Sequence, residues 1–314
     1  FKFQYDELQR PTDTIVNDAC VERLVYGTTS DENQIGQLIQ NYNQSGKSEF
    51  VKFDFKGNLL CQLNTFCEDY SGAIDWNGTP LLIEEEFKNK IEYNAFNKPL
   101  FFFQPDGCGI FYYYDKGGLL NTVVYTAYDG SGDITHIQNI TYNARGQREN
   151  IYYGNNTKTR FDYNPLNFRL TRVLTTRNSG VDILQDLNYT YDSVGNIIEQ
   201  YDDAQQIHYF DNEVVYPINE YTYDPLYRLL TAKGRELSNL SIPTEEDFVN
   251  YISCPNPSPD AIQKYTQTFQ YDPLGNILQM SSVGNWTRDY VYNYPMDNNY
   301  LIGHGGGTAY TYDA

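Results

Sequence analysis

The sequence predicts an all-β protein, built as an array of β-hairpins, and three observations support this fold class. First, a short phrase recurs along the 314 residues: an aromatic residue, a spacer, Tyr or Phe, Asp or Asn, and then often Gly with a polar residue. Second, Tyr (31) and Phe (17) are abundant, and both suit the half-buried surface of a strand. Third, long amphipathic helical periodicity is absent. Because a repeated supersecondary unit dictates architecture, we interpret the chain first as a repeat array.

Each copy of the phrase predicts a strand, a tight turn and a second strand. The two aromatic residues lie at i and i+2 and therefore point to one face of a strand. Asp or Asn with a following Gly is turn chemistry, and Pro165, Pro225 and Pro273 fit a turn position with fixed φ. The clear copies are FQYD at 3–6, FDFKGN at 53–58, ITYNARGQ at 140–147, FDYNP at 161–165, YTYDSVGN at 189–196, YTYDP at 221–225, FQYDPLGN at 269–276 and YTYD at 310–313.

The repeat residues are predicted to have structural roles, with the aromatic residues holding the sheet and the glycines permitting the turns. On this interpretation Tyr191→Ala destabilises the protein by about 3 kcal/mol, as deletion of a core aromatic side chain does. We also place motif tyrosines at Tyr93, Tyr114 and Tyr128, and the copies at Tyr93 and Tyr114 are weak. The predicted structural motif consists of Tyr5, Asp6, Phe53, Gly57, Tyr142, Gly146, Tyr163, Tyr191, Asp192, Gly195, Tyr223, Asp224, Tyr271, Asp272, Gly275 and Tyr312.

The repeats predict a single β array over residues 1–314, with two irregular insertions. One insertion lies near 66–90. The other lies near 238–264, where four prolines predict a surface loop with one short helix around 245–251. Because the last copy stops at Tyr312-Asp313, before its turn, we expect the chain to be a segment of a larger polypeptide.

Charge and cysteine content exclude some classes of function. The formal net charge of −19 argues against nucleic acid or an anionic membrane as partner, since both need clustered Lys and Arg. No apolar run approaches the ~18 residues that span a bilayer. The five cysteines form neither a disulfide framework nor a zinc site. Cys61 and Cys67 are close enough in sequence to form a local bridge, and buried free thiols are the alternative.

No constellation of residues predicts catalysis, a metal or a cofactor. His136, His208 and His304 stand outside any nucleophile motif, and the glycines after His304 lack the Gly-x-Ser-x-Gly elbow of an esterase. The run at 129–133 (DGSGD) resembles half of a calcium loop, but it lacks the Glu at position twelve, so we predict a hairpin turn. Acidic runs are expected to be solvated.

The phrase and its surroundings resemble the YD repeats of Rhs proteins, toxin-complex proteins and teneurins. The resemblance is strongest in the second half, and there the chain is similar to the Rhs-repeat region of insecticidal toxin-complex C components. The segments that carry it are YNARGQR at 142–148, YNPLNFRL at 163–170, DDAQQ at 202–206, YDPLYRL at 223–229 and GRE at 234–236.

The resemblance implies a spiral sheet that forms part of a hollow Rhs shell (β-cocoon) around a toxic C-terminal domain. It also implies a companion B-type shell component, a translocation component and secretion as part of a larger toxin. Members of the family carry an aspartyl self-cleavage module, but its signature is not found here, since Asp224-Pro225 and Asp272-Pro273 belong to repeat turns. The alternatives are a teneurin-like cell-surface adhesion module and a carbohydrate-binding module.

Overall fold

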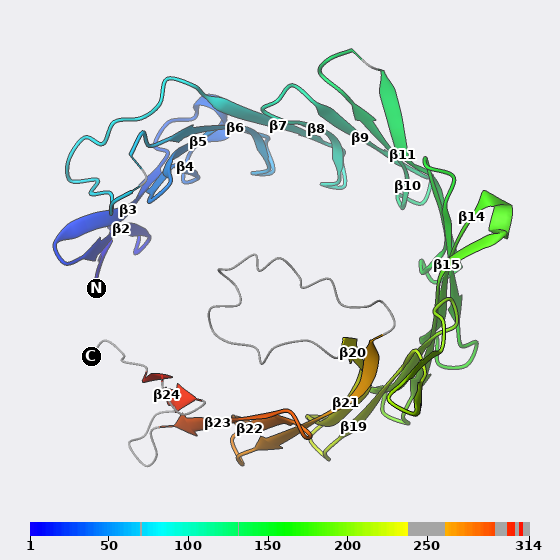
Figure 1. Ribbon diagram of the computed structural model, residues 1–314. Helices are drawn as coiled ribbons and strands as arrows, with labels where there is room; N and C mark the ends of the chain where they lie inside the picture. The colour runs from blue at the N-terminus through cyan, green and yellow to red at the C-terminus, as the bar shows by residue number, and fades with distance from the viewer. Residues whose placement is uncertain (70, 131, 238–260, 293–299, 305–307, 310–314) are drawn as a thin grey trace. The chain divides into compact units, whose positions relative to one another are not determined.

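The all-β fold class is confirmed by a computed structural model, which describes residues 1–314 except 70, 131, 238–260, 293–299, 305–307 and 310–314 (Figure 1). The strands form two compact units, Phe1–Asn155 and Asn156–Ala314. The described helices are two 3₁₀ turns, η1 (Asp31–Asn33) and η2 (Asn178–Gly180). Tyr312 and the predicted helix at 245–251 lie outside the described residues.

The first unit is an antiparallel meander in which every strand pairs with the next one along the chain. Its strands are β1 (Lys2–Tyr5), β2 (Pro11–Val16), β3 (Ala19–Tyr26), β4 (Leu38–Asn43), β5 (Gly46–Phe53), β6 (Leu59–Phe66), β7 (Phe87–Tyr93), β8 (Pro99–Phe103), β9 (Gly109–Tyr114), β10 (Leu120–Thr126), β11 (Asp133–Tyr142) and β12 (Arg148–Tyr153).

The second unit repeats this pattern, except that a separate two-stranded hairpin interrupts it between β16 and β19. Its strands are β13 (Lys158–Tyr163), β14 (Leu170–Arg177), β15 (Asp182–Tyr191), β16 (Ile197–Asp202), β17 (His208–Phe210), β18 (Glu213–Val215), β19 (Ile218–Tyr223), β20 (Leu229–Leu237), β21 (Ile262–Tyr271), β22 (Ile277–Ser282), β23 (Trp286–Tyr292), β24 (Leu301–His304) and β25 (Thr308–Ala309).

The repeat turns share one edge of the sheet within each unit, because successive antiparallel strands run in opposite directions. Across most of these turns the repeat aromatic residue pairs with the residue six positions later, as Tyr5 does with Pro11 and Tyr191 with Ile197. The register shifts by one residue at each such pair. This is the geometry of a type I turn closed by a bulge, a common hairpin connection.

The largest buried cluster in the described part of the first unit lies under the connection between β6 and β7. Trp76 and Ile74 from this connection pack with Cys20, Cys67 and the Tyr42 ring. Within the predicted insertion near 66–90, Cys67, Ile74 and Trp76 are thus packed against β3 and β4. The last residues of this insertion, from Phe87, belong to β7, while residues 262–264 of the second insertion belong to β21.

Hydrogen bonds over long sequence separations hold this connection in place. The backbone N–H of Trp76 donates to the Cys20 carbonyl (2.8 Å), and the indole Nε1–H donates to the Asn43 carbonyl (3.0 Å). In return the Asp75 carboxylate accepts from the Cys20 backbone N–H (2.8 Å). Because the polar groups of the segment are paired, it can be buried without an unsatisfied backbone.

Candidate functional site: the repeat turns

The Asp192 turn shows how the sequence phrase closes a hairpin. The backbone N–H of Asp192 donates to the Asn196 carbonyl (3.0 Å). Its carboxylate Oδ1 accepts the backbone N–H groups of Val194, Gly195 and Asn196 at 3.0, 2.7 and 2.9 Å. One side chain therefore satisfies three donors of the turn, which explains why Asp or Asn recurs at this position.

The same side-chain bonds form at the other well-preserved turns. Oxygen Oδ1 accepts the N–H groups two and four residues later at Asp6, Asp54, Asn94, Asn143 and Asp224, at distances between 2.8 and 3.0 Å. At Asp272 the described contact is with the N–H four residues later (2.8 Å). The predicted motif members Asp6, Asp192, Asp224 and Asp272 thus occupy equivalent positions.

In six of the described turns the side chain four positions later pairs with the Asp or Asn side chain. Oδ2 of Asp192 accepts from the Asn196 amide (2.7 Å), and Oδ2 of Asp224 accepts from Arg228 Nε (2.6 Å). In the turn that begins at Asn143 the direction reverses, because the Asn143 amide donates to Gln147 Oε1 (3.0 Å). In these pairs an Asp is followed by a donor and Asn143 by an acceptor. Reasoning from the sequence did not identify this pairing, although the i, i+4 spacing carries its signal.

The residue before this partner adopts positive φ in every well-preserved turn, and glycine is not always used. Gly57, Gly146, Gly195 and Gly275 have φ values of 85°, 77°, 119° and 100°. The equivalent residues in other turns are not glycine; they are Gln9 (61°), Asn97 (59°) and Tyr227 (65°). Near 60° a residue with a side chain is tolerated at modest cost, whereas glycine adopts the wider angles freely.

Tyrosine hydroxyl groups connect five of the described hairpins to the one before. Each donates to the carbonyl of the residue that begins the second strand of the preceding hairpin, and we call this set the tyrosine ladder. Its members are Tyr114 to Pro99 (2.7 Å), Tyr142 to Leu120 (2.6 Å), Tyr191 to Leu170 (2.7 Å), Tyr223 to Ile197 (2.8 Å) and Tyr292 to Ile277 (3.1 Å).

Cationic side chains make contacts in the opposite direction, from one turn to the next. The Arg169 guanidinium donates to the Asp192 carbonyl (2.9 Å) and lies over the Tyr191 ring, 5.6 Å from its centroid. Arg228 repeats this contact, with the Asp272 carbonyl at 2.9 Å and the Tyr271 ring at 4.8 Å. In the first unit Lys98 donates to the Gly118 carbonyl. The turn at Asp192 is thus fixed to both of its neighbours.

Other repeat residues lie at the strand ends where the phrase places them. Tyr5, Phe53, Tyr163 and Tyr271 end β1, β5, β13 and β21. The structure adds Tyr292, whose sequence YVYN at 290–293 fits the phrase but was not identified. It also adds the turn from Phe103 to Gly109, which has the same backbone bonds at the opposite edge.

The assignment of Tyr128 as a repeat tyrosine is wrong. Tyr128 lies between Thr126, the last residue of β10, and Asp133, the first of β11, and its side chain is 79% exposed. No strand ends there, so the residue is part of a connection. Thr126 pairs with Asp133 in the antiparallel β10–β11 hairpin, and residue 131 of the predicted turn lies outside the described residues.

The remaining candidate groups show no catalytic arrangement among the described residues. No group of three or more His, Cys, Asp or Glu side chains in this part of the chain is placed to hold a metal ion. Cys20, Cys61, Cys67 and Cys108 are free thiols. Burial raises the pKa of Cys20 and of Cys67, which disfavours the reactive thiolate. The described helices include none that is long and apolar enough to cross a membrane.

Comparison with curated proteins identifies sequence relatives of this chain. A scan against protein-family models finds no match. Among curated proteins, the chain is 31% identical over 266 residues to toxin subunit YenC1 of Yersinia entomophaga, covering 79% of this chain. It is 28% identical over 281 residues to toxin subunit YenC2 of the same organism, covering 84%. The chain is homologous to Tc toxin C subunits.

Solved structures of Tc toxins have the same fold as this C-subunit homologue. The crystal structure of TcdB2-TccC3-TEV matches 96% of the chain with a TM-score of 0.75 and 28% identity. The Tc holotoxin pore of Photorhabdus luminescens matches 95%, with the same TM-score and identity. The matched region is the β-sheet shell. The chain spans 26% and 29% of the two curated relatives and 15% of each of these two structures.

Proposed function

We propose that this chain is a wall segment of a toxin-complex shell that encloses a toxic C-terminal polypeptide and keeps it inactive until delivery. The segment itself acts by confinement, without catalysis. The single observation that carries the proposal is the match of 96% of the chain to the shell of TcdB2-TccC3-TEV. An enclosed polypeptide is prevented from folding and from reaching its target for as long as the wall remains closed.

The contacts of the repeat turns support a role as a wall. Each described strand within a meander pairs with its neighbours, so few backbone groups are left to bind other chains. Tyrosine hydroxyls and cationic side chains also link several turns to their neighbours. A sheet fixed in this way resists local opening, which is the physical requirement for confining a cargo.

The relatives indicate which partners to expect. The matched structures contain TcdB2 together with TccC3, and one is a holotoxin pore. By analogy, we propose that the complete protein pairs with a B-type shell component, joins a translocation component and functions outside the producing cell.

Protease protection in the complete C component, co-expressed with its B component, tests the proposal. The toxic region is expected to resist digestion in the parent protein and to become cleavable in Tyr191→Ala/Tyr223→Ala, which removes two members of the tyrosine ladder. Tyr128→Ala is the control, since this exposed tyrosine lies in a connection. Rapid digestion of the toxic region in the assembled parent, at the same rate as in the assembled double variant, would contradict enclosure. A cryo-EM map showing this segment outside the shell wall would also contradict it.

A further inference from the structure

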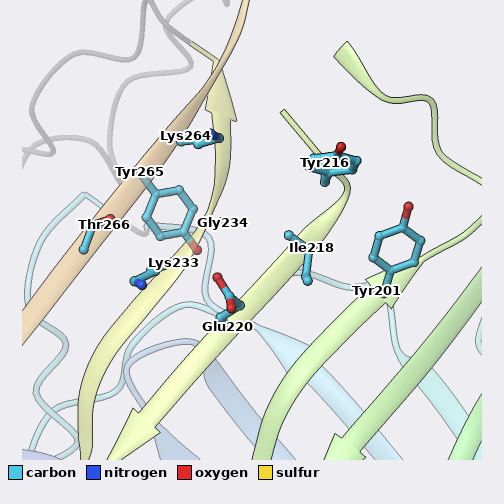
Figure 2. A pocket seen from close by; sticks show the side chains of 9 residues that line it. All are labelled: Tyr201, Tyr216, Ile218, Glu220, Lys233, Gly234, Lys264, Tyr265 and Thr266. Atoms are coloured by element: carbon cyan, nitrogen blue, oxygen red, sulfur yellow. The ribbon is translucent and has the colours of Figure 1, made fainter. Parts of the chain in front are cut away.

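A groove of about 530 Å³ lies over β16, β19, β20 and β21 in the second unit (Figure 2). Its volume lies within the range of small-molecule sites. Strand pairing builds its floor, because Tyr201 lies opposite Ile218 and Glu220 lies opposite Lys233. Alternation places these four side chains on the same face of the sheet. The groove is therefore a property of the sheet surface and separate from the repeat turns.

The connection between β16 and β19 forms the second wall. Its β17–β18 hairpin contacts β21, and Val215 at the end of β18 is only 1% exposed. The ion pair between Lys264 and Glu213 (3.1 Å) links the hairpin to β21. Immediately after Val215 the chain turns back at Pro217, where the Ile218 N–H donates to the Tyr216 carbonyl (2.9 Å). This tight turn holds Tyr216 at the rim of the groove, near Tyr201 and Ile218 (Figure 2).

The polar groups of the groove are left available for a ligand. Within the described residues, the hydroxyl groups of Tyr201 and Tyr216, the Glu220 carboxylate and the Lys233 ammonium have no hydrogen-bond or ion-pair partner. The repeat tyrosines differ in this respect, because Tyr191 and Tyr223 donate to backbone carbonyls. Two tyrosine rings with unused donors and acceptors beside them are the features of a recognition site rather than of packing.

We propose that this groove binds a neutral saccharide. The negative face of a tyrosine ring attracts the weakly positive C–H groups of a sugar ring. Glu220 accepts hydrogen bonds from sugar hydroxyl groups, and Lys233 donates to them. The formal charges of Glu220 and Lys233 cancel, and Lys264 is paired with Glu213, so the lining favours neither an anion nor a cation. A polyhydroxylated, uncharged ligand uses both charged groups and leaves no net charge uncompensated.

Titration of the chain with maltotetraose, cellotetraose and chitotetraose tests the proposal by calorimetry or NMR. Saturable binding of at least one of these neutral sugars is expected. Tyr216→Ala and Glu220→Gln should each weaken it about tenfold or more, since each removes a contact at the ligand. Both residues are exposed enough for these changes to preserve the fold, with Tyr216 49% exposed. Tyr128→Ala is the matched control and should bind as the parent does.

Three results would overturn the proposal: no binding of any neutral tetrasaccharide, binding unchanged in both groove variants, or binding only of the dipeptide Gly-Tyr or of a heparin tetrasaccharide. Gly-Tyr tests a peptide ligand and the heparin fragment an acidic sugar. The proposal is independent of the wall function, because the groove variants leave the tyrosine ladder intact. Protease protection of the cargo in Tyr216→Ala and Glu220→Gln is therefore expected to equal that of the parent.

Discussion

The Asp or Asn side chain at the head of a repeat turn accepts backbone N–H groups of that turn, and at Asp192 and Asn143 it also pairs with the side chain four residues later. Asp192→Asn replaces the charged acceptor of the Asn196 amide by a neutral amide, so Asn196 has to turn its oxygen toward the new N–H, and the charge-assisted bond is lost. We expect a lower urea midpoint for Asp192→Asn. Adding Asn196→Gln should recover more than half of the loss, because the pair then matches Asn143 and Gln147.

Equilibrium unfolding of the four proteins of this double-mutant cycle measures the coupling. The change Asn196→Gln alone is the control for the longer side chain. Additive midpoints, with no recovery in the double variant, would show that the backbone bonds alone determine the stability of the turn.

Loss of one tyrosine hydroxyl has an expected cost of about 1 kcal/mol, the usual net contribution of a hydrogen bond. Tyr191→Phe removes the bond to the Leu170 carbonyl (2.7 Å) and leaves the ring in place, whereas Tyr128→Phe removes a hydroxyl from a side chain that is 79% exposed. Urea unfolding should therefore show a loss in the first variant and almost none in the second. Equal stabilities would exclude the tyrosine ladder as a source of stability.

Acid is expected to loosen the turns, because their carboxylates bind protons less readily when folded. The Arg10 backbone N–H is the largest contribution that lowers the pKa of Asp6, and the Asn58 side chain is the largest that lowers that of Asp54. The pKa of Asp192 and of Asp224 is also lowered, since hydrogen bonds outweigh the opposing effect of burial. A depressed folded pKa gives stability that is present above the ordinary value of 3.8 and is lost as pH falls below it.

Melting temperatures between about pH 6 and about pH 2.5 test this expectation. The steepest loss should lie below about pH 4, and Asp192→Asn/Asn196→Gln should lose less than the parent because it has one fewer titrating turn. A melting temperature that rises on acidification through this window would contradict the assignment.

Replacing the turn glycine is expected to cost different amounts of stability in different hairpins. The cost is larger where a side chain from a neighbouring turn lies close to the glycine. A Cβ at Gly195 would lie 2.8 Å from Arg169 Nη2, and the residue has φ 119°, whereas a Cβ at Gly275 (φ 100°) meets nothing within 4 Å. Gly195→Ala and Gly275→Ala share the cost of the backbone angle, about 1 kcal/mol or more. Only Gly195→Ala also displaces the Arg169 side chain, which donates to the Asp192 carbonyl of the same turn as Gly195.

We therefore expect Gly195→Ala to be the more destabilising of the two in urea unfolding. Arg169→Ala should reduce the difference between them, because it removes the group that the new methyl meets. Equal losses in both glycine variants would indicate that the backbone angle alone sets the requirement for glycine.

Most strands and turns were predictable from the sequence, because the information for each hairpin lies within about ten residues. The phrase at 189–196 contains all the residues that form one turn. Tyr191 ends the strand, the Asp192 side chain accepts backbone N–H groups, and Gly195 adopts positive φ. The tyrosine ladder was not predictable in this way. Tyr223 donates to Ile197, 26 residues earlier, and that distance depends on the length of the intervening hairpin. The contacts of Trp76 with Cys20 depend on a packed connection without sequence periodicity.

At the level of the whole molecule, the charge of −19 is a net repulsion that the folded chain must overcome. We expect the melting temperature to rise when NaCl increases from about 10 mM to about 200 mM, because salt screens exposed charges separated by more than about 10 Å. Ion pairs such as Arg160 with Asp162 would be weakened by the same salt, but such exposed pairs contribute little. A melting temperature that falls with added NaCl would show that attraction outweighs repulsion.

The direction of the tyrosine ladder has a consequence for how the protein is made. Every hydroxyl in it belongs to the later hairpin and every acceptor carbonyl to the earlier one. A hairpin leaving the ribosome therefore lacks its tyrosine bond until the next one has been synthesised, and it gains that bond from the newcomer. We therefore expect these bonds to form in the order of synthesis, each one when the next hairpin along the chain has been made.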